Sequence, residues 1–134
     1  MKKNPADKSL KYVLENVKNI AIVGASANPE RDSYRVMKFL INYGYKIFPV
    51  NPKEIEILGL RCYPSLISIE EKIDMVDIFR AKEHILDHAK EAIRIGASIL
   101  WMQEGVTDQK SLSLGKSSGL KVIMNECPKK VLEN

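Results

Sequence analysis

The stretch Asn19-Ile20-Ala21-Ile22-Val23-Gly24-Ala25-Ser26 decides the fold that this chain can adopt. Four consecutive apolar residues that end at a glycine are typical of a short strand buried on both faces. Small and turn-forming residues follow at 25–29, and a helical pattern begins near Asp32 or Ser33. A strand, a glycine-containing turn and a helix N-terminus in this order favour an anion such as a nucleotide phosphate, because backbone N–H groups and the helix dipole point toward the turn.

Helical and strand patterns alternate along the rest of the chain. Apolar spacing predicts helices at 9–15 with Ser9 as the N-cap, at 34–43, 83–95 and 108–117, and from Pro128, after a loose start at 1–8. Strands are expected at 19–24, 45–50, 55–63, 75–79, 98–102 and 120–124. This alternation predicts an α/β, Rossmann-like fold of three αβα layers around a mostly parallel sheet of five to six strands. We expect the strand order 3-2-1-4-5-6, in which the segment 55–63 is the third strand and lies at the edge.

The composition predicts one soluble globular domain over residues 1–134, with 45% apolar and 28% charged residues. No run approaches the ~18 apolar residues of a membrane span, and no signal-peptide core follows Met1, so we expect a cytoplasmic protein with no membrane partner. Cys62 and Cys127 are too few for a disulfide framework. The net charge of +4 is mild and its lysines are dispersed, which argues against nucleic acid as a partner.

Ligands of open α/β sheets bind outside the carboxyl ends of the strands. The residues that follow the predicted strands are mostly small, amide-bearing or cationic: 24–26, 51–53, 80–82, 103–105 and 125–127. Such a rim favours phosphates and a polar ligand arm over acid–base chemistry. The sequence offers no Ser-His-Asp set or carboxylate pair, and His84 and His88, four residues apart on a helix, are expected on a solvated face. We therefore expect neither a catalytic nor a metal site.

The end of the second predicted strand discriminates between candidate ligands. An NAD site places an acidic residue there to hold the ribose hydroxyls. This strand instead ends Val50-Asn51-Pro52-Lys53, and a lysine beside the ribose suits a phosphorylated ribose, as in NADP or coenzyme A. The residues leave both ligands open, although Ser26 and Pro29 replace the second and third glycines of a dinucleotide fingerprint.

Short motifs in register along the chain carry a family resemblance. In order, they are Val23-Gly24-Ala25-Ser26, Arg31, Ser33, Gly44-Tyr45, Pro49-Val50-Asn51-Pro52, Gly59, Tyr63-Pro64-Ser65-Leu66, Asp74, Val76-Asp77-Ile78-Phe79-Arg80, Trp101-Met102-Gln103-Glu104-Gly105 and Gly119-Leu120. From residue 19 onward the chain resembles the stand-alone CoA-binding domain proteins of the YccU-like type. The same fold forms the N-terminal CoA-binding domain of succinyl-CoA synthetase α subunits. The chain departs from the family pattern at Asn125-Glu126-Cys127, where an acidic residue and an arginine usually precede the cysteine.

The resemblance implies a domain that binds coenzyme A or acyl-CoA without catalysis. Gly24, Ala25 and Ser26 would approach the pyrophosphate, which Arg31 and Ser33 would neutralise and bond. Val50, Asn51 and Pro52 would line the adenosine side, Lys53 would reach the 3′-phosphate, Phe79 and Arg80 would border the pantetheine path, and Trp101, Gln103 and Gly105 would lie further along it. The alternative is an NADP-binding oxidoreductase or redox-sensing module. The acyl group, a protein partner or homodimer, and a mixed disulfide between Cys127 and CoA are left open.

Overall fold

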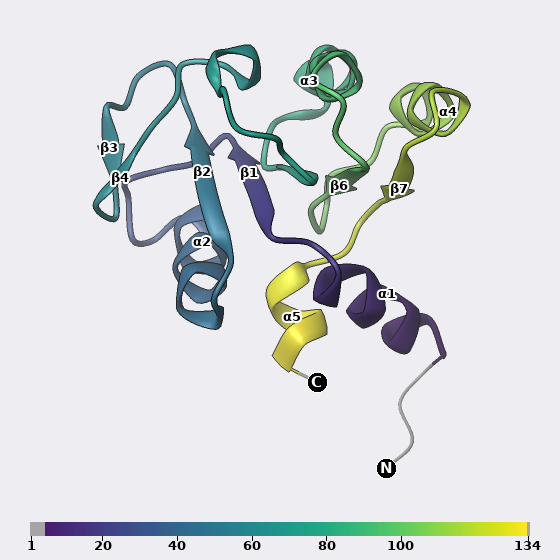
Figure 1. The fold of residues 1–134 in the computed structure, drawn as a ribbon, viewed down its shortest axis with the longest axis horizontal. Helices are drawn as coiled ribbons and strands as arrows, with labels where there is room; N and C mark the ends of the chain where they lie inside the picture. The colour runs from purple at the N-terminus through teal and green to yellow at the C-terminus, as the bar shows by residue number, and fades with distance from the viewer. Residues whose placement is uncertain (1–4, 134) are drawn as a thin grey trace.

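The computed structural model describes residues 5–133, and its centre is a five-stranded parallel sheet with helices on both faces (Figure 1). In spatial order the strands are β2 (Lys46–Val50), β1 (Asn19–Val23), β5 (Met75–Ile78), β6 (Ile99–Met102) and β7 (Lys121–Ile123). Helices α1 (Pro5–Glu15), α2 (Asp32–Tyr43) and α5 (Pro128–Glu133) cover one face, and α3 (Lys82–Arg94) and α4 (Gln109–Ser117) cover the other. The predicted Rossmann-like αβα fold is confirmed.

Residues 20–23 of β1 are all apolar because both faces of the strand are covered there. Ile20 and Ile22 pack into the core under α1, α2 and α5, whereas Ala21 and Val23 pack into the core under α3. All four side chains are at most 1% exposed. Alternate side chains of a strand point to opposite faces, so burial on both sides requires an unbroken apolar run.

The predicted edge strand at 55–63 is wrong, because this segment folds back on itself instead of extending along β2. Leu58 and Gly59 both have positive φ, at 51° and 77°, and they reverse the chain. The short strands β3 (Glu56–Ile57) and β4 (Leu60–Arg61) therefore pair antiparallel as a separate hairpin. The sheet has five strands, within the expected five to six, and the expected strand order holds without its third strand.

One residue after the hairpin still contacts the sheet edge. The Tyr63 N–H donates to the Pro49 carbonyl at 2.8 Å, and the Tyr63 carbonyl accepts from the Asn51 N–H at 2.9 Å. Pro64 follows and has no N–H with which to extend the pairing. The chain then forms a short 3-10 turn, η1 (Leu66–Ser68).

The first helix is longer than predicted. It begins at Pro5 rather than at Ser9, so residues 5–8 of the expected loose start are helical, and residues 1–4 of it lie outside the described residues. Proline is favourable in the first turn of a helix because its missing N–H has no intrahelical acceptor there. Within residues 5–133, no helix combines the length and apolar character that crossing a membrane requires.

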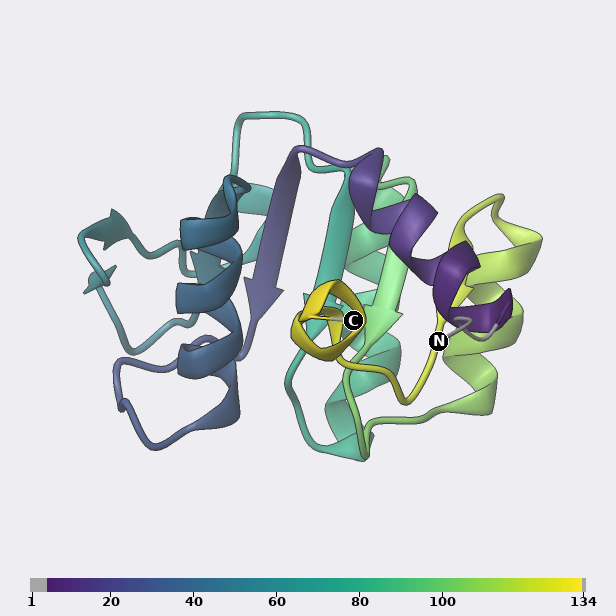
Figure 2. The same cartoon turned by 90° about the horizontal axis from the view of Figure 1, so that it is seen from below.

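All five strands run in the same direction, so their carboxyl ends lie at one edge of the sheet. Figure 2 shows the arrowheads pointing to that edge and the loop between β1 and α2 extending beyond it. The residues expected to bind a ligand follow these strand ends. The fold therefore gathers segments that are far apart in the sequence around one surface.

Candidate functional site

The turn after β1 depends on a glycine that no other residue could replace without strain. Gly24 has φ +84°, and a Cβ built on it would lie 2.2 Å from the backbone oxygen of Phe79. A side chain would thus collide with the end of β5, and its backbone conformation would also be unfavourable. The close approach brings the β1–α2 loop against the carboxyl end of the neighbouring strand.

Side chains hold the β1–α2 loop in shape. The Ser26 hydroxyl oxygen accepts from the Asn28 N–H at 3.0 Å, and the Asn28 side-chain oxygen accepts from the Glu30 N–H at 3.0 Å. From β2, the Asn51 side-chain amide donates to the Ala25 carbonyl at 2.8 Å. The loop is therefore organised by bonds within the protein before any ligand arrives, which reduces the entropy that binding must offset.

The N-terminus of α2 opens toward this loop. Arg31 occupies the N-cap position and makes no side-chain cap hydrogen bond, so no side chain satisfies the first N–H groups of the helix there. Ser33, in the first turn, is 5% exposed. A helix N-terminus without a side-chain cap is suited to an anion, because its N–H groups and its dipole both favour negative charge.

A cleft of about 630 Å³ lies between this loop and the ends of β5 and β6. Its lining combines backbone and side chains from five segments: Gly24, Ala25, Ser26, Glu30, Arg31, Asp32, Ser33, Asn51, Phe79, Arg80, Gln103, Glu104 and Val106. The volume falls in the range of small-molecule sites. No metal-ligating cluster of three or more His, Cys, Asp or Glu side chains occurs within residues 5–133.

The charges in the cleft favour an anionic ligand. Arg31 and Arg80 have no ion pair with any residue of the described part of the chain. Two of the three acidic residues are already paired with cations, Asp32 with Arg35 and Glu104 with Lys130. Two guanidinium groups thus face a cleft in which only Glu30 offers an uncompensated carboxylate, and guanidinium is well matched to phosphate oxygens.

Two smaller cavities adjoin the cleft at opposite sides. One, of about 170 Å³, shares Gly24 and Arg80 with the cleft and reaches Val50 and Pro52 at the end of β2. The other, of about 260 Å³, shares three lining residues with the cleft and reaches Cys127 and α5: these are Asp32, Gln103 and Glu104. The cleft therefore has a centre at the glycine turn and extensions in two directions.

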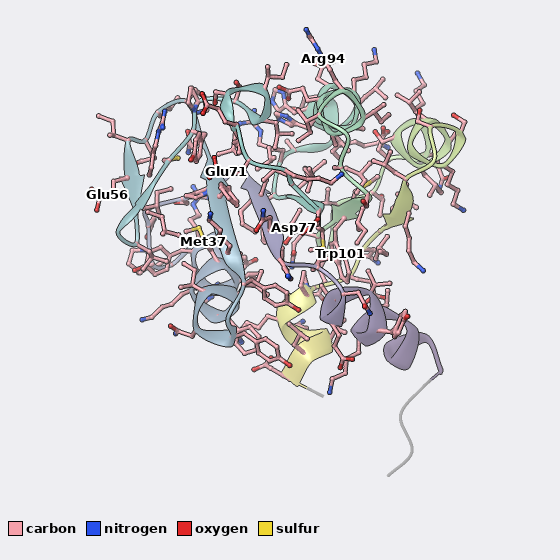
Figure 3. All side chains as sticks on the ribbon, in the orientation of Figure 1. Met37, Glu56, Glu71, Asp77, Arg94 and Trp101 are labelled. Atoms are coloured by element: carbon pink, nitrogen blue, oxygen red, sulfur yellow. The ribbon has the colours of Figure 1, made fainter. Side chains whose placement is uncertain are left out.

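An acidic side chain is buried in β5, two residues before Phe79, which lines the cleft. Asp77 of β5 is fully buried, and neither of its carboxyl oxygens has a hydrogen-bond partner among the described residues. It is the register neighbour of Trp101 on β6 (Figure 3). Burial raises the pKa of Asp77 well above its usual value of 3.8. The side-chain oxygen of Gln103, which lines the cleft, is likewise buried without a partner in that part of the chain.

Comparison with known proteins identifies the family. Residues 18–133 match the family model described as the CoA binding domain. The chain belongs to the CoA-binding domain family. This CoA-binding domain is 37% identical to the uncharacterized protein YneT of Bacillus subtilis, over 94% of the chain and 93% of YneT. The expected kinship with stand-alone CoA-binding domain proteins is thereby confirmed.

Two further relatives allow the fold and the length of the chain to be compared with known proteins. The solved structure of a hypothetical protein from Pyrococcus horikoshii OT3 is 36% identical with a TM-score of 0.93, and the match covers 99% of the chain and 96% of that protein. The acetate–CoA ligase (ADP-forming) of Methanocaldococcus jannaschii is 42% identical over 72 residues, which are 54% of the chain and 10% of the ligase. The chain thus corresponds to a small part of that ligase.

Most of the predicted site residues of this CoA-binding domain meet at the cleft. Nine line it directly: Gly24, Ala25, Ser26, Arg31, Ser33, Asn51, Phe79, Arg80 and Gln103. Val50 and Pro52 line the smaller cavity at the end of β2. Lys53 and Gly105 follow strand ends as predicted, but they line neither the cleft nor its two extensions.

The structure corrects the placement of Trp101. Its side chain has no exposed surface and packs in the core under α2 and α5. The indole N–H donates to the Glu126 carbonyl at 2.9 Å, which satisfies its one polar group. Trp101 therefore packs between the sheet and the helices α2 and α5, and it does not line the cleft. Cys127 follows the last strand as expected, where it is buried and lines the cavity beside α5.

Several lining residues have no sequence signal that marks them as part of a site. Glu30, Asp32 and Val106 line the cleft because of how the loops fold, and ordinary loop composition does not single them out, whereas Glu104 belongs to the expected strand-end segment 103–105. Asp77, which lines none of these cavities, does carry a sequence signal, because an acidic residue inside the apolar stretch 75–79 is unusual. His88, expected on a solvated face, lines the smaller cavity and contacts Glu91.

Proposed function

We propose that this protein binds coenzyme A or an acyl-CoA in the cleft and does so without catalysing a reaction. The observation that carries the proposal is the glycine turn at Gly24 facing a helix N-terminus without a side-chain cap and two arginines, Arg31 and Arg80. This arrangement supplies backbone donors, a helix dipole and fixed positive charge at one point, as a diphosphate requires.

The shape of the cleft supports an elongated ligand with different ends. Coenzyme A has an adenosine end with a 3′-phosphate, a central diphosphate and a pantetheine arm that ends in a thiol. The extension at Val50 and Pro52 suits the adenosine end, and the extension at Gln103 suits the arm. The family membership, shown over residues 18–133, agrees with this choice of ligand.

The chemistry of the lining supports binding rather than catalysis. The described residues that line the cleft include no histidine or cysteine, and the Ser26 hydroxyl oxygen is engaged by the Asn28 N–H instead of by a base. Nucleophilic catalysis requires a nucleophile with a base in hydrogen-bond reach. A carrier, a sensor or a detached subunit of a ligase would need only the binding site.

The deciding experiment is calorimetric titration of the purified, nucleotide-stripped protein with CoA, dephospho-CoA, acetyl-CoA and NADP. We expect CoA and acetyl-CoA to bind and NADP to give no heat. Weaker binding of dephospho-CoA, with the difference abolished in Lys53→Ala, would support Lys53 as the contact of the 3′-phosphate. Binding of NADP with CoA silent would refute the proposal and favour an NADP-dependent oxidoreductase or redox-sensing module.

A further inference from the structure

A second large cavity lies at the amino edge of the sheet, opposite to the edge that carries the cleft. Its volume is about 600 Å³, and it shares no lining residue with the cleft or with the two cavities that adjoin the cleft. Helices α1 and α2 each lead into a strand, so the parallel pairing of β1 and β2 places both helix ends at this edge (Figure 2). The amino-edge cavity is lined by Leu14, Glu15, Val17, Lys18, Asn19, Tyr43, Gly44, Tyr45 and Lys46.

The walls of the amino-edge cavity are apolar and partly aromatic. Leu14 and Val17 are buried on the side of α1. On the side of α2, the rings of Tyr43 and Tyr45 are nearly parallel, with 5.8 Å between their centroids. The Tyr45 hydroxyl donates to the Leu14 carbonyl, which ties the two sides together. Tyr43 is 50% exposed, so its ring retains a free area on which a flat apolar group can stack.

Two charged groups of the lining have no ion-pair partner among the described residues, and they have opposite signs. They are the carboxylate of Glu15 and the ammonium group of Lys18. The third charged side chain of the lining is engaged on the other face of the sheet, where Lys46 Nζ lies 3.9 Å from Glu71 Oε2 and over the Phe48 ring. A ligand in the cavity therefore meets one unpaired negative group and one unpaired positive group.

The two helix ends add negative potential to that of Glu15. The C-terminus of a helix carries a partial negative charge, which a basic residue in the last turn can offset. Helices α3, α4 and α5 each have such a residue, whereas the last turns of α1 and α2 have none. Burial, Tyr43 and the charge of Glu15, in this order, raise the pKa of Tyr45 to about 12, so the carboxylate acts on the aromatic side of the cavity. A cationic group of a ligand is therefore favoured near Glu15.

We propose that the amino-edge cavity binds a free aromatic amino acid, with its ammonium group toward Glu15, its carboxylate toward Lys18 and its ring on Tyr43. An amine without a carboxylate would leave Lys18 unpaired, and an acid without an ammonium group would face Glu15 and the two helix ends. Both charged side chains are exposed, so each ion pair contributes little and the apolar walls supply much of the affinity. The inference does not depend on the proposed function, because the cavity and the cleft share no residue.

The test is a titration of the isotope-labelled protein with phenylalanine, followed by NMR. We expect saturable shifts of the amide signals of residues 14–19 and 43–46, and no shift at Gly24. Three analogues each lack one feature of the ligand: phenethylamine the carboxylate, 3-phenylpropionate the ammonium group and glycine the ring. Loss of one exposed ion pair should weaken binding roughly twofold to fivefold, and glycine should give no saturable shift.

Variants of the lining separate the contributions of its three features. Glu15→Gln should reduce the preference for phenylalanine over 3-phenylpropionate, and Lys18→Gln should reduce the preference over phenethylamine. Tyr43→Ala should weaken the binding of phenylalanine, whereas Tyr12→Ala, an exposed tyrosine of α1 that does not line the cavity, is the matched control and should not.

Three results would overturn the inference. They are the absence of saturable shifts around the cavity, equal binding of phenylalanine and phenethylamine by the parent, and unchanged preferences in the Glu15→Gln and Lys18→Gln variants with their fold verified by circular dichroism. Titration with CoA tests the proposed function separately, so failure of one proposal leaves the other standing.

Discussion

The side-chain amide of Asn51 donates a hydrogen bond of 2.8 Å to the backbone oxygen of Ala25. The side-chain oxygen of Asn51 accepts from the Lys53 N–H at 2.9 Å, so both ends of the amide are engaged. One side chain thereby ties the end of β2 to the loop between β1 and α2. The shape of the proposed diphosphate site depends on a residue of the neighbouring strand, which acts on the loop that meets the ligand.

Asn51→Asp should weaken CoA binding about tenfold or more. The variant replaces a donor with a second acceptor, so a carboxylate oxygen would face the Ala25 carbonyl and the loop would lose its tie. We also expect the free energy of unfolding to fall by about 1–3 kcal/mol, the usual cost of an unpaired buried polar group. Calorimetric titration and urea unfolding measure the two effects.

Asn125→Asp is the matched control for Asn51→Asp. Its side-chain oxygen accepts from the Gly105 N–H at 2.8 Å, and aspartate keeps that acceptor while adding the same charge to another loop of the same edge. We expect a much smaller loss of affinity. Equal losses of CoA affinity in the two variants would show that the added negative charge alone weakens binding, and that the hydrogen bond to Ala25 does not contribute.

The elements with strong local patterns were predictable from the sequence. The run 19–24 predicted β1 because a strand covered on both faces needs consecutive apolar residues, and the glycine at its end marks where the strand stops. The stretch 55–63 misled because its apolar residues fit a strand, whereas Leu58 has positive φ, which nothing in its side chain indicates. Leucine is rarely found in that region, so of the two turn residues only Gly59 carried a sequence signal.

The residues that line the cleft could be predicted from their positions at strand ends, but the hydrogen bonds that they make could not. Asn51 was expected on the adenosine side, yet its amide is used by Ala25, a residue 26 positions earlier in the chain. Trp101 was expected at the ligand path, but the face on which a strand-end side chain lies depends on the strand's exact end and on the helices that cover it. Contacts between distant segments decide both the hydrogen-bond partner of Asn51 and the burial of Trp101, and a local sequence pattern does not predict such contacts.

Gly24→Ala should lower the free energy of unfolding by roughly 2–5 kcal/mol and abolish CoA binding. The estimate combines strain at positive φ with the collision between the new Cβ and the Phe79 oxygen. The control is Gly105→Ala, which has φ +79° but no atom within 4 Å of the added Cβ. That variant should lose only about 1–2 kcal/mol. Urea unfolding measures the free energy of unfolding of both variants. Equal decreases in Gly24→Ala and Gly105→Ala would mean that the collision with the Phe79 oxygen does not destabilise the fold.

Arg31→Ala should reduce CoA affinity about tenfold and make the remaining binding less sensitive to salt. A guanidinium that bonds a phosphate contributes more than a neutral hydrogen bond, and salt screens the part of that attraction which is exposed. Titrations at two salt concentrations measure both effects, with circular dichroism to verify the fold. Arg94→Ala removes the same charge from the exposed last turn of α3, and it should change neither the affinity for CoA nor its dependence on salt. Unchanged affinity in Arg31→Ala would remove Arg31 from the site.

Asp77 gives the stability of this protein a dependence on pH. Burial raises its pKa in the folded state above the value of 3.8 that an ordinary aspartate has. The folded state therefore holds a proton that the unfolded state has released, and stability falls as the pH rises from about 4 toward the folded pKa. Below pH 4 both states are protonated, and the penalty disappears.

Asp77→Asn should remove this dependence, because asparagine keeps the shape of the side chain but has no proton to release. Relative to the parent, the free energy of unfolding of the variant should rise by about 1.4 kcal/mol for each pH unit above 4. This rise should stop at the pH at which Asp77 ionises in the folded protein. Urea unfolding at several values between pH 4 and pH 8 measures the gain. Asp87→Asn, at an exposed position on α3, should follow the parent at every pH. A constant difference between Asp77→Asn and the parent would mean that Asp77 titrates alike in the folded and unfolded states, through a partner that compensates its burial.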